Sequence, residues 1–183
     1  MTTLASAPLR ARPAGAPCSP PPLAATPDGR LLLRPALPGD ADALVAMHDR
    51  CSLETRIARW HAPIRGIPAR YLAEVTSCAP GHPAVVAAKT SQPYELVGLA
   101  SACLVSPDVW ELGMLVEDAR QRQGIGRAML RVLVDDVIRR GARELLAVSL
   151  DERRSVLRNL HELGPVEYSA ESTTVTAHVL LSR

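Results

Sequence analysis

The sequence predicts an α/β fold in which helices flank a mixed β-sheet. Three observations support this prediction. Short apolar runs of strand length alternate along the chain with segments that have a helical apolar period. The chain is 47% hydrophobic and 22% charged, so it can bury a substantial core. Pro35 stops the first apolar run, and Gly141 and Gly164 end two helical segments. We therefore expect strands and helices packed in layers.

Residues 1–26 are expected to be a disordered leader, and residues 27–183 are expected to be the folded domain. The leader is rich in proline and alanine and has no apolar period. Its two arginines, Arg10 and Arg12, have no acidic residue nearby to match them. Without them, the basic residues of the chain equal its 19 acidic residues in number. This balance argues against a nucleic-acid-binding domain with a broad basic face.

The first half of the domain is expected to begin with a strand and to continue with helices. Residues 29–35 form the short strand. Asp40, or the turn before it, is expected to cap a helix that extends to residue 50. Two further helical segments are predicted at residues 52–60 and 67–76.

The middle of the domain is expected to form three strands. Residues 84–90 and 96–105 read as a hairpin around a turn at residues 91–94. Residues 108–116 form the third strand, which leads into a polar loop. After that loop a helix is expected from Ile125 to Gly141, with one apolar face formed by Ile125, Met129, Val132, Leu133 and Val137.

The C-terminal part is expected to alternate again. Residues 144–150 form a strand of the fully buried type, and residues 151–164 form a helix that Gly164 ends. Two last strands are predicted at residues 166–169 and 174–181.

The loop before the helix at Ile125 contains two glycines around one isoleucine, Q121-R-Q-G-I-G126. A helix N-terminus presents free backbone N–H groups and the positive end of the helix dipole, so this loop could bind a phosphate. The alternative is an ordinary tight turn into a helix. A dinucleotide-binding fingerprint does not fit, because Met129 stands where its third glycine is required. A Walker loop does not fit either, because the chain has no Gly-Lys-Ser/Thr sequence.

The motif Gln121-Arg122-Gln123-Gly124-Ile125-Gly126 resembles the Q/R-x-x-G-x-G/A signature of the GNAT superfamily of acyl-CoA-dependent N-acyltransferases. The resemblance extends over roughly residues 30–183. It implies the GNAT fold, with a mixed and mostly antiparallel central sheet flanked by helices. It also implies acetyl-CoA as cosubstrate and an amine as acceptor, either on a protein lysine or on a small molecule. A homodimer is compatible with it, and neither nucleic acid nor a membrane is an expected partner.

The resemblance also assigns cofactor-binding residues. The backbone of the strand before the loop is expected to pair with the pantetheine arm, and an N–H near Met114 or Leu115 is expected to polarise the thioester carbonyl. The loop is expected to wrap the pyrophosphate, with Arg122 and Arg127 either adding charge or lying in solvent. The predicted cofactor-binding residues are Met114, Leu115, Val116, Gln121, Arg122, Gln123, Gly124, Ile125, Gly126, Arg127 and Arg153.

Acyl transfer to an amine needs a base, because a lysine-type amine has a pKa near ~10.4. Glu111 is the only acid within an apolar strand, and alternation puts it on the face of Gly113. Burial there is expected to raise its pKa above the reference value of ~4.3. The alternative is a solvated glutamate or one paired with an arginine. GNAT domains of the bacterial protein-lysine acetyltransferase type carry a general-base Glu five residues before the motif Val, as Glu111 stands to Val116.

A second segment, C51-S-L-E-T-R-I-A-R-W60, is similar to the S-x-E-S/T-x-x-x-R-F segment of that subgroup, with Trp60 in place of Phe. In the subgroup the segment belongs to the acceptor side. Helix packing alone is an alternative explanation of this match.

Two positions depart from the family pattern. Many members place a Tyr that protonates the leaving thiolate where this chain has Leu160, so the general acid is unassigned. Arg153 stands where an Asn often contacts the cofactor, and it either reaches a CoA phosphate or lies at the surface. These departures favour an alternative function, a non-catalytic module that binds acyl-CoA as a sensor. His48, His82 and His161 are expected to be packing or surface residues.

The four cysteines, at positions 18, 51, 78 and 103, are scattered and have no metal-ligand spacing. We therefore expect inert thiols, no metal site and a cytoplasmic protein. No apolar run is long enough to span a bilayer, and the start lacks the apolar region of a signal peptide.

Overall fold

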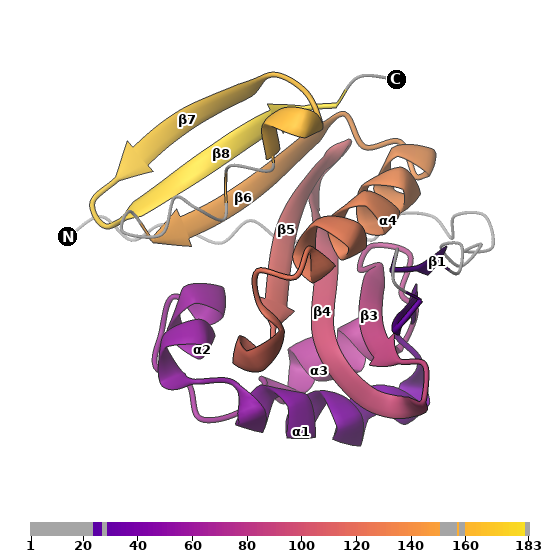
Figure 1. The fold of residues 1–183 in the computed structure, drawn as a ribbon. Helices are drawn as coiled ribbons and strands as arrows, with labels where there is room; N and C mark the ends of the chain where they lie inside the picture. The colour runs from indigo at the N-terminus through magenta and orange to yellow at the C-terminus, as the bar shows by residue number, and fades with distance from the viewer. Residues whose placement is uncertain (1–23, 27–28, 151–156, 158–159, 182–183) are drawn as a thin grey trace.

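The computed structural model describes residues 24–26, 29–150, 157 and 160–181, and its strands form one sheet (Figure 1). The order across the sheet is β1-β2-β3-β4-β5-β6-β8-β7, and every neighbouring pair is antiparallel except β5 and β6. The predicted mixed and mostly antiparallel sheet is therefore confirmed. The strands are β1 (Ala24–Ala25), β2 (Leu31–Pro35), β3 (Ala84–Lys89), β4 (Gln92–Ser106), β5 (Val109–Val116), β6 (Glu144–Leu150), β7 (Val166–Glu171) and β8 (Thr174–Leu180).

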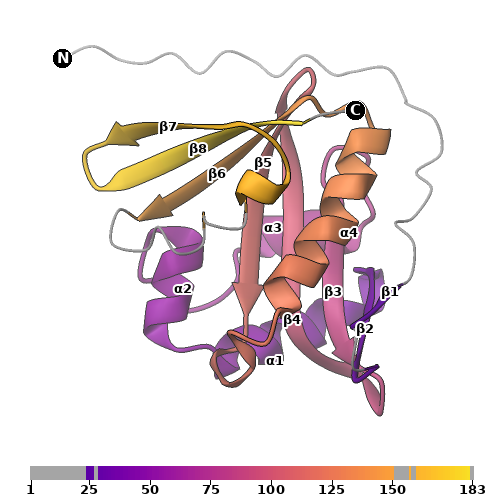
Figure 2. The same cartoon turned by 45° about the horizontal axis from the view of Figure 1, so that its top comes forward.

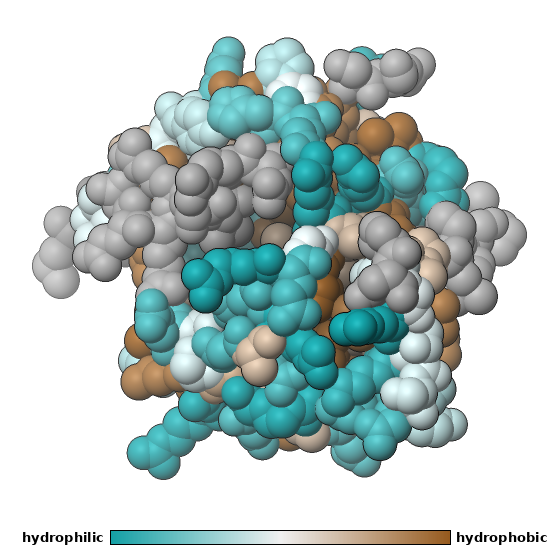
Figure 3. Space-filling model, in the orientation of Figure 1, coloured by the Kyte–Doolittle hydropathy of each residue, from teal (hydrophilic) through white to brown (hydrophobic). Residues whose placement is uncertain are grey.

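Helices cover both faces of the sheet. The helices are α1 (Ala41–Arg50), α2 (Leu53–Trp60), α3 (Ala69–Thr76) and α4 (Ile125–Arg139), with 3-10 turns at Pro38–Asp40 and Asp118–Arg120. Figures 1 and 2 show α4 on one face, with α1 and α3 on the other. None of the described helices is long and apolar enough to cross a membrane. Hydrophilic residues dominate the face seen in Figure 3, with apolar side chains visible between them near its middle.

Two aliphatic clusters fill the space between the helices and the sheet. On one face, Met129 and Leu133 of α4 pack in a cluster with alternate residues of the central strands, such as Val85. On the other face, Leu44 of α1 and Val75 of α3 pack in a cluster with the remaining alternate residues of β3 and β4, such as Val86. Since strand side chains alternate in direction, β3 and β4 are apolar on both sides and form the centre of the core.

The sheet divides between β5 and β6. The two strands pair only where residues 109–112 face residues 144–147. Beyond Leu112 and Ala147 no pairing continues, and Figures 1 and 2 show the strands diverging. One edge of the second half of β5 is therefore left open inside the sheet.

Asp40 does not cap α1 through its side chain, although the sequence predicts a cap there. Its buried carboxylate instead binds the Arg34 guanidinium through two hydrogen bonds of 2.6 and 2.7 Å. It also accepts the Leu37 N–H at 2.8 Å. The hydrogen bond to Asp40 raises the pKa of Arg34, despite the opposing effect of burial. This pair ties β2 to the start of α1.

Other differences from the predicted elements are small. The hairpin turn lies at residues 90–91, because β4 already begins at Gln92 and tolerates Pro93 near its outer end. Ala24 and Ala25 pair with β2, so the described sheet begins inside the predicted leader, while residues 1–23 lie outside the described residues. Most of the predicted helix at 151–164 also lies outside them. Its described end, residues 160–162, is a 3-10 turn.

Candidate active site

The loop between β5 and α4 presents unused backbone donors. The first backbone hydrogen bond of α4 runs from the Ala128 N–H to the Gly124 carbonyl, at 3.0 Å. The N–H groups of residues 122–127 have no acceptor within the part of the chain that the structure describes. They lie at the positive end of the α4 dipole, where an anion is stabilised. This loop, which we call the amide cradle, is therefore suited to a phosphate.

The two glycines of the cradle have different structural roles. Gly124 has a φ of 79°, a conformation that residues with a side chain rarely adopt. Gly126 lies so close to β5 that an added Cβ would be 3.1 Å from the Met114 sulfur. Between them, the Ile125 side chain is only 3% exposed and anchors the loop in the core. The loop therefore combines a tight turn into the helix with unused backbone donors, so the two interpretations of the sequence do not exclude each other.

Side chains of the loop brace its shape. The amide of Gln121 donates to the Val116 carbonyl at 3.1 Å, and the amide of Gln123 donates to the Ala119 carbonyl at 3.0 Å. Arg127 forms an ion pair with Glu162 at 2.6 Å, so its charge is already matched. Exposed Arg122 has no acidic partner among the described residues and is a free charge beside the cradle.

The open edge of β5 points into the gap between β5 and β6. The Glu117 N–H donates to Val97 of β4, whereas the Asp108 carbonyl accepts from residues 143 and 144 on the β6 side. Strand alternation then directs the backbone N–H of Met114 and that of Val116 toward the gap. The same alternation directs the Leu115 amide toward β4, and the Leu115 side chain is buried. The structure therefore brings Met114 and Val116 to the gap, but not Leu115.

Glu111 lies on the α1–α3 face of β5, the face of Gly113 and Leu115. The prediction that it is buried is wrong, because its side chain is exposed to solvent. No described residue supplies a hydrogen bond or an ion pair to it. Among the described residues, its carboxylate is therefore left available to a ligand.

Arg59 of α2 reaches across β5 to Gly113, a contact that the sequence analysis did not single out. A Cβ on Gly113 would overlap the guanidinium, so only glycine leaves room for it. The guanidinium also lies over the ring of Trp60, at 4.3 Å, and over the ring of Tyr71, at 5.1 Å. A sequence signal did exist, since Arg59 occupies the arginine position of the segment that matches the lysine-acetyltransferase subgroup.

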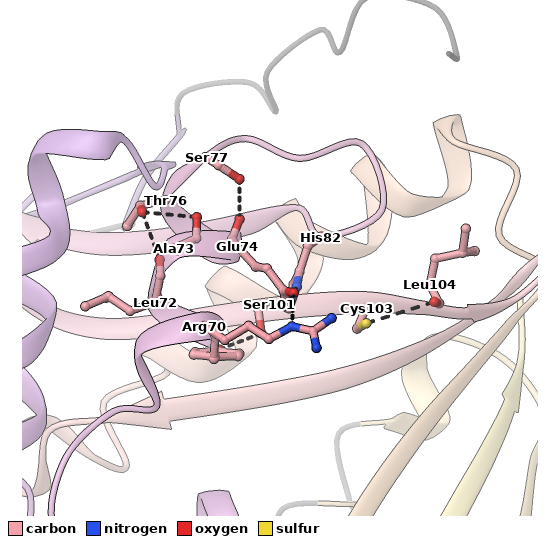
Figure 4. A network of polar contacts seen from close by, with 11 residues as sticks. Arg70, Leu72, Ala73, Glu74, Thr76, Ser77, His82, Ser101, Cys103 and Leu104 are labelled. Atoms are coloured by element: carbon pink, nitrogen blue, oxygen red, sulfur yellow. Dashed lines mark hydrogen bonds and ion pairs between the residues drawn. The ribbon is translucent and has the colours of Figure 1, made fainter. Parts of the chain in front are cut away.

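Helix α3 carries a polar network (Figure 4), and its Tyr71 ring lies 5.1 Å from the Arg59 guanidinium. The Tyr71 hydroxyl shares a hydrogen bond of 2.8 Å with the buried hydroxyl of Ser101 on β4. Glu74 binds both Arg70, at 2.9 Å, and His82, at 3.1 Å. Burial lowers the pKa of His82, and the charge of Arg59 acts in the same direction against the pull of Glu74. His82 is therefore a packed, partnered residue, as expected from the sequence.

Asp118, just after β5, joins the α2 segment to the cradle. Its carboxylate accepts from the Ser52 N–H at 2.8 Å, from the Ser52 hydroxyl at 2.7 Å and from the Thr55 hydroxyl at 2.8 Å. The Thr55 hydroxyl also accepts the side-chain amide of Gln121, at 3.0 Å. Burial alone would raise the pKa of Asp118, but these hydrogen bonds outweigh it and hold the pKa below 3.8. We call this group of four residues the Asp118 clasp.

Two of the thiols lie near the site without being reactive. Burial, followed by the charges of Asp118 and Glu117, raises the pKa of Cys51 to about 11. Burial, followed by the charge of Glu111, raises the pKa of Cys103. Both thiols are protonated at neutral pH and are poor nucleophiles. Cys18 and Arg153 lie outside the described residues. The described residues contain no cluster of three or more side chains that could hold a metal ion.

The structure also shows the surroundings of Leu160, which stands where many family members have a tyrosine. Leu160 is 2% exposed and packs in the cluster under α4. His161, beside it, shares a hydrogen bond of 2.7 Å with the exposed Tyr168. Leu160 is thus a core residue.

The amide cradle lies at a helix N-terminus, beside a gap between two parallel strands of a mixed sheet. The cradle suits a phosphate group and the gap suits an extended arm attached to it, so the fold and the site together indicate a class of protein that can hold such a ligand. The sequence model of the acetyltransferase (GNAT) family matches residues 52–164. The chain therefore belongs to this family of acetyltransferases, as its motif predicts. A comparison with curated protein sequences found no significant match.

Solved structures show the same fold. The GNAT domain of S. lividans PAT is 22% identical with a TM-score of 0.77, and the match covers 87% of this chain and 96% of that one. A phosphinothricin acetyltransferase from Sinorhizobium meliloti in complex with AcCoA is 19% identical with a TM-score of 0.66, over 83% and 89% of the two chains. The putative acetyltransferase yncA from Salmonella typhimurium, with its cofactor acetyl-CoA, is 20% identical with a TM-score of 0.65, over 84% and 95%.

Proposed function

We propose that the protein transfers an acetyl group from acetyl-CoA to a primary amine, on a protein lysine or a small molecule. The observation that carries this proposal is the amide cradle, whose free N–H groups lie at the end of the strand that also bears Glu111. Two of the similar structures hold acetyl-CoA, which supports the choice of acyl donor. Acetyl-CoA supplies the activated acetyl group as a thioester.

The residues of this chain would each perform one task. The N–H groups of residues 122–127 bind the pyrophosphate, and Arg122 adds positive charge. The Met114 N–H, which points into the gap, donates to the thioester carbonyl and stabilises the charge that develops there. Glu111 removes a proton from the acceptor amine, directly or through a water molecule. The amine then attacks the carbonyl without a covalent enzyme intermediate, in agreement with the protonated state of Cys51 and Cys103.

Calorimetric titration tests the donor site first. We expect acetyl-CoA to bind, and CoA without the acetyl group to bind as well, since the cradle contacts the pyrophosphate that both share. Release of free CoA thiol in the presence of an amine then tests transfer. If neither acetyl-CoA nor CoA binds, the cradle is only a turn and the proposal is wrong. If both bind and no amine is acetylated, the alternative function as an acyl-CoA sensor is favoured.

Replacing Asp118 by Ala is expected to raise the KM for acetyl-CoA roughly 3- to 10-fold, because the Asp118 clasp holds the cradle against α2. We expect a loss of about 1–2 kcal/mol in the free energy of unfolding, since several hydrogen bonds to a charged acceptor are removed at an exposed site. Asp135→Ala, which removes an exposed acid from α4, is the matched control; it should leave the KM unchanged and should not lower the free energy of unfolding, because alanine is the better helix former. An unchanged KM in Asp118→Ala would show that the clasp does not shape the cradle.

The clasp also predicts a pH dependence. A carboxylate whose pKa is lowered on folding contributes stability above its unfolded pKa, and it loses that contribution as pH falls through the folded pKa. The stability difference between the protein and Asp118→Asn should therefore be complete above pH 3.8, the ordinary value for the group, and should shrink below it. Urea unfolding at several pH values measures this difference, and a difference that disappears already near neutral pH would contradict the assignment.

A further inference from the structure

His48 of α1, expected from the sequence to be a packing or surface residue, is fully buried, and its two ring nitrogens have different surroundings. The indole N–H of Trp60, the last residue of α2, donates to the Nε2 of His48 at 3.3 Å. Because an indole nitrogen can only donate, this Nε2 carries a lone pair and the ring proton lies on Nδ1. The Nδ1 has no hydrogen-bond partner among the described residues, and the Asp49 carboxylate lies 3.8 Å from it. The structure therefore requires one particular tautomer of His48.

Only the neutral ring of His48 can accept this hydrogen bond. A protonated ring would carry an N–H on Nε2, which would face the N–H of Trp60. Burial lowers the pKa of His48, the charge of Arg56 on α2 acts in the same direction, and the charge of Asp49 on α1 opposes both. At neutral pH the imidazole is therefore uncharged and able to accept.

The Trp60 ring lies beside the residues on the acceptor side of the proposed site, the face of β5 that bears Glu111. The Arg59 guanidinium lies over this ring at 4.3 Å, and a Cβ on Gly113 would overlap the same guanidinium. The ring also meets the ring of Tyr71 edge to face at 4.9 Å. A guanidinium over the face of a tryptophan is attracted to that face. The place of Arg59 over β5 therefore depends on how the Trp60 ring is held.

Helix α2 is tied to its surroundings by polar contacts near both ends. None of its residues is buried, so these contacts matter more than they would for a helix with an apolar face in the core. The Asp118 clasp fixes the start of the helix through Ser52 and Thr55. The hydrogen bond to His48 joins its last residue to α1. His48 thus supplies a contact at the end that bears Arg59.

We propose that His48 is a positioning residue for the acceptor side, because its neutral ring fixes the indole of Trp60 and thereby the place of Arg59. This inference rests on the proposed function and adds to it a residue that contacts neither substrate. Arg59 lies over Gly113, two residues along β5 from Glu111. When the hydrogen bond is lost, the indole can turn and the guanidinium leaves this place. The path of the amine toward Glu111 then changes, while the amide cradle does not.

Three variants separate this role from a general packing role. His48→Leu removes the acceptor and keeps a buried apolar side chain, His48→Gln keeps an oxygen that can accept the indole N–H, and Trp60→Phe keeps a ring without the donor. A lysine-containing peptide and free lysine serve as acceptors. We expect His48→Leu and Trp60→Phe to raise the KM for the amine roughly 3- to 10-fold, the effect of losing one buried neutral hydrogen bond, and to leave the KM for acetyl-CoA unchanged. His48→Gln should restore most of the loss. His161→Leu, which removes a histidine bonded to Tyr168 of β7, is the control and should change neither KM.

Nuclear magnetic resonance gives readouts that do not depend on turnover. The nitrogen signals of the His48 ring should show a protonated Nδ1 and an unprotonated Nε2 at neutral pH. The side-chain protons of Arg59 should be shifted by the Trp60 ring, and this shift should be lost in His48→Leu and kept in His48→Gln. If the protein acetylates neither acceptor but the Arg59 shift depends on His48 in this way, the positioning stands and the proposed function fails alone.

Circular dichroism shows whether each variant is folded, and if His48→Leu is not, Trp60→Phe carries the same test of the two KM values. A proton on Nε2 of His48 would overturn the inference. So would an Arg59 signal or an amine KM that is unchanged in folded His48→Leu. An equal rise of the KM for the amine and of the KM for acetyl-CoA would also overturn it, because that result indicates a general structural role.

Discussion

Glu111→Gln is expected to lower kcat/KM for amine acetylation by about 10²- to 10⁴-fold near neutral pH, the usual contribution of a positioned general base. The amide has nearly the shape of the carboxylate but cannot accept the proton of an ammonium acceptor. The loss should become smaller at higher pH, where more of the amine is already neutral. Release of CoA thiol, followed across pH with saturating acetyl-CoA, measures this effect.

Two controls make the result specific. The affinity for acetyl-CoA should not change, because Glu111 and the amide cradle lie at opposite ends of β5. Glu167→Gln, which changes an exposed acid on β7, should leave the rate unchanged. If Glu111→Gln acetylates as fast as the parent protein, Glu111 is not the base. If the parent protein itself binds acetyl-CoA and acetylates nothing, the sensor alternative gains support.

Gly126→Val is expected to weaken acetyl-CoA binding by at least about 100-fold, because the cradle can no longer keep its shape. The first side-chain carbon would already be 3.1 Å from the Met114 sulfur and 3.9 Å from a Val116 methyl. The two further methyl groups of valine would push the start of α4 away from β5 or project into the cradle. Calorimetric titration with acetyl-CoA measures the loss.

Stability must be followed in parallel, since overpacking itself costs roughly 1–3 kcal/mol. Circular dichroism should show a folded protein with a lower melting temperature. Gly126→Ala is the milder variant and should bind acetyl-CoA with an intermediate affinity, because the end of the flexible Met114 side chain can move. Gly66→Val is the control, since no atom lies within 4 Å of a Cβ at Gly66. A folded Gly126→Val protein that binds acetyl-CoA normally would show that the cradle is not the donor site.

In the proposed reaction, groups on both faces of β5 and on its edge beside β6 take part. Met114 and Val116 face α4, where Gly126 packs against them. Glu111 and Gly113 face the opposite side, where Arg59 of α2 lies. The backbone of Met114 points into the gap beside β6. A donor held at the cradle and an acceptor held near Arg59 would thus meet at this gap, on opposite sides of one strand.

The Asp118 clasp links the α2 segment, on the acceptor side, to the amide cradle, on the donor side. Ser52 and Thr55 belong to the segment that bears Arg59, whereas Asp118 and Gln121 belong to the cradle. The similarity of this segment to the acceptor segment of lysine acetyltransferases therefore has a structural explanation in this chain. The serine and the threonine hold the helix against the cradle.

Features that depend only on neighbours along the chain could be predicted from the amino-acid sequence. The bounds of β5 and α4, the polar loop between them and the glycine at position 124 follow from local periodicity and helix-start chemistry, whereas glycine is required at position 126 by the close approach of α4 to Met114 of β5. The family could be recognised from this segment because the motif at residues 121–126 is contiguous in the sequence. Such a short motif is enough to position the backbone N–H groups of the cradle.

The pairing of side chains within the described residues could be read only from the three-dimensional structure. Asp40, predicted to cap a helix, binds Arg34, and Glu111, predicted to be buried, is exposed. Arg59 meets Gly113, and Asp118 meets Ser52 across 66 positions of the sequence. Burial and pairing depend on which strands and helices become neighbours, and a local pattern carries no information about those distant partners.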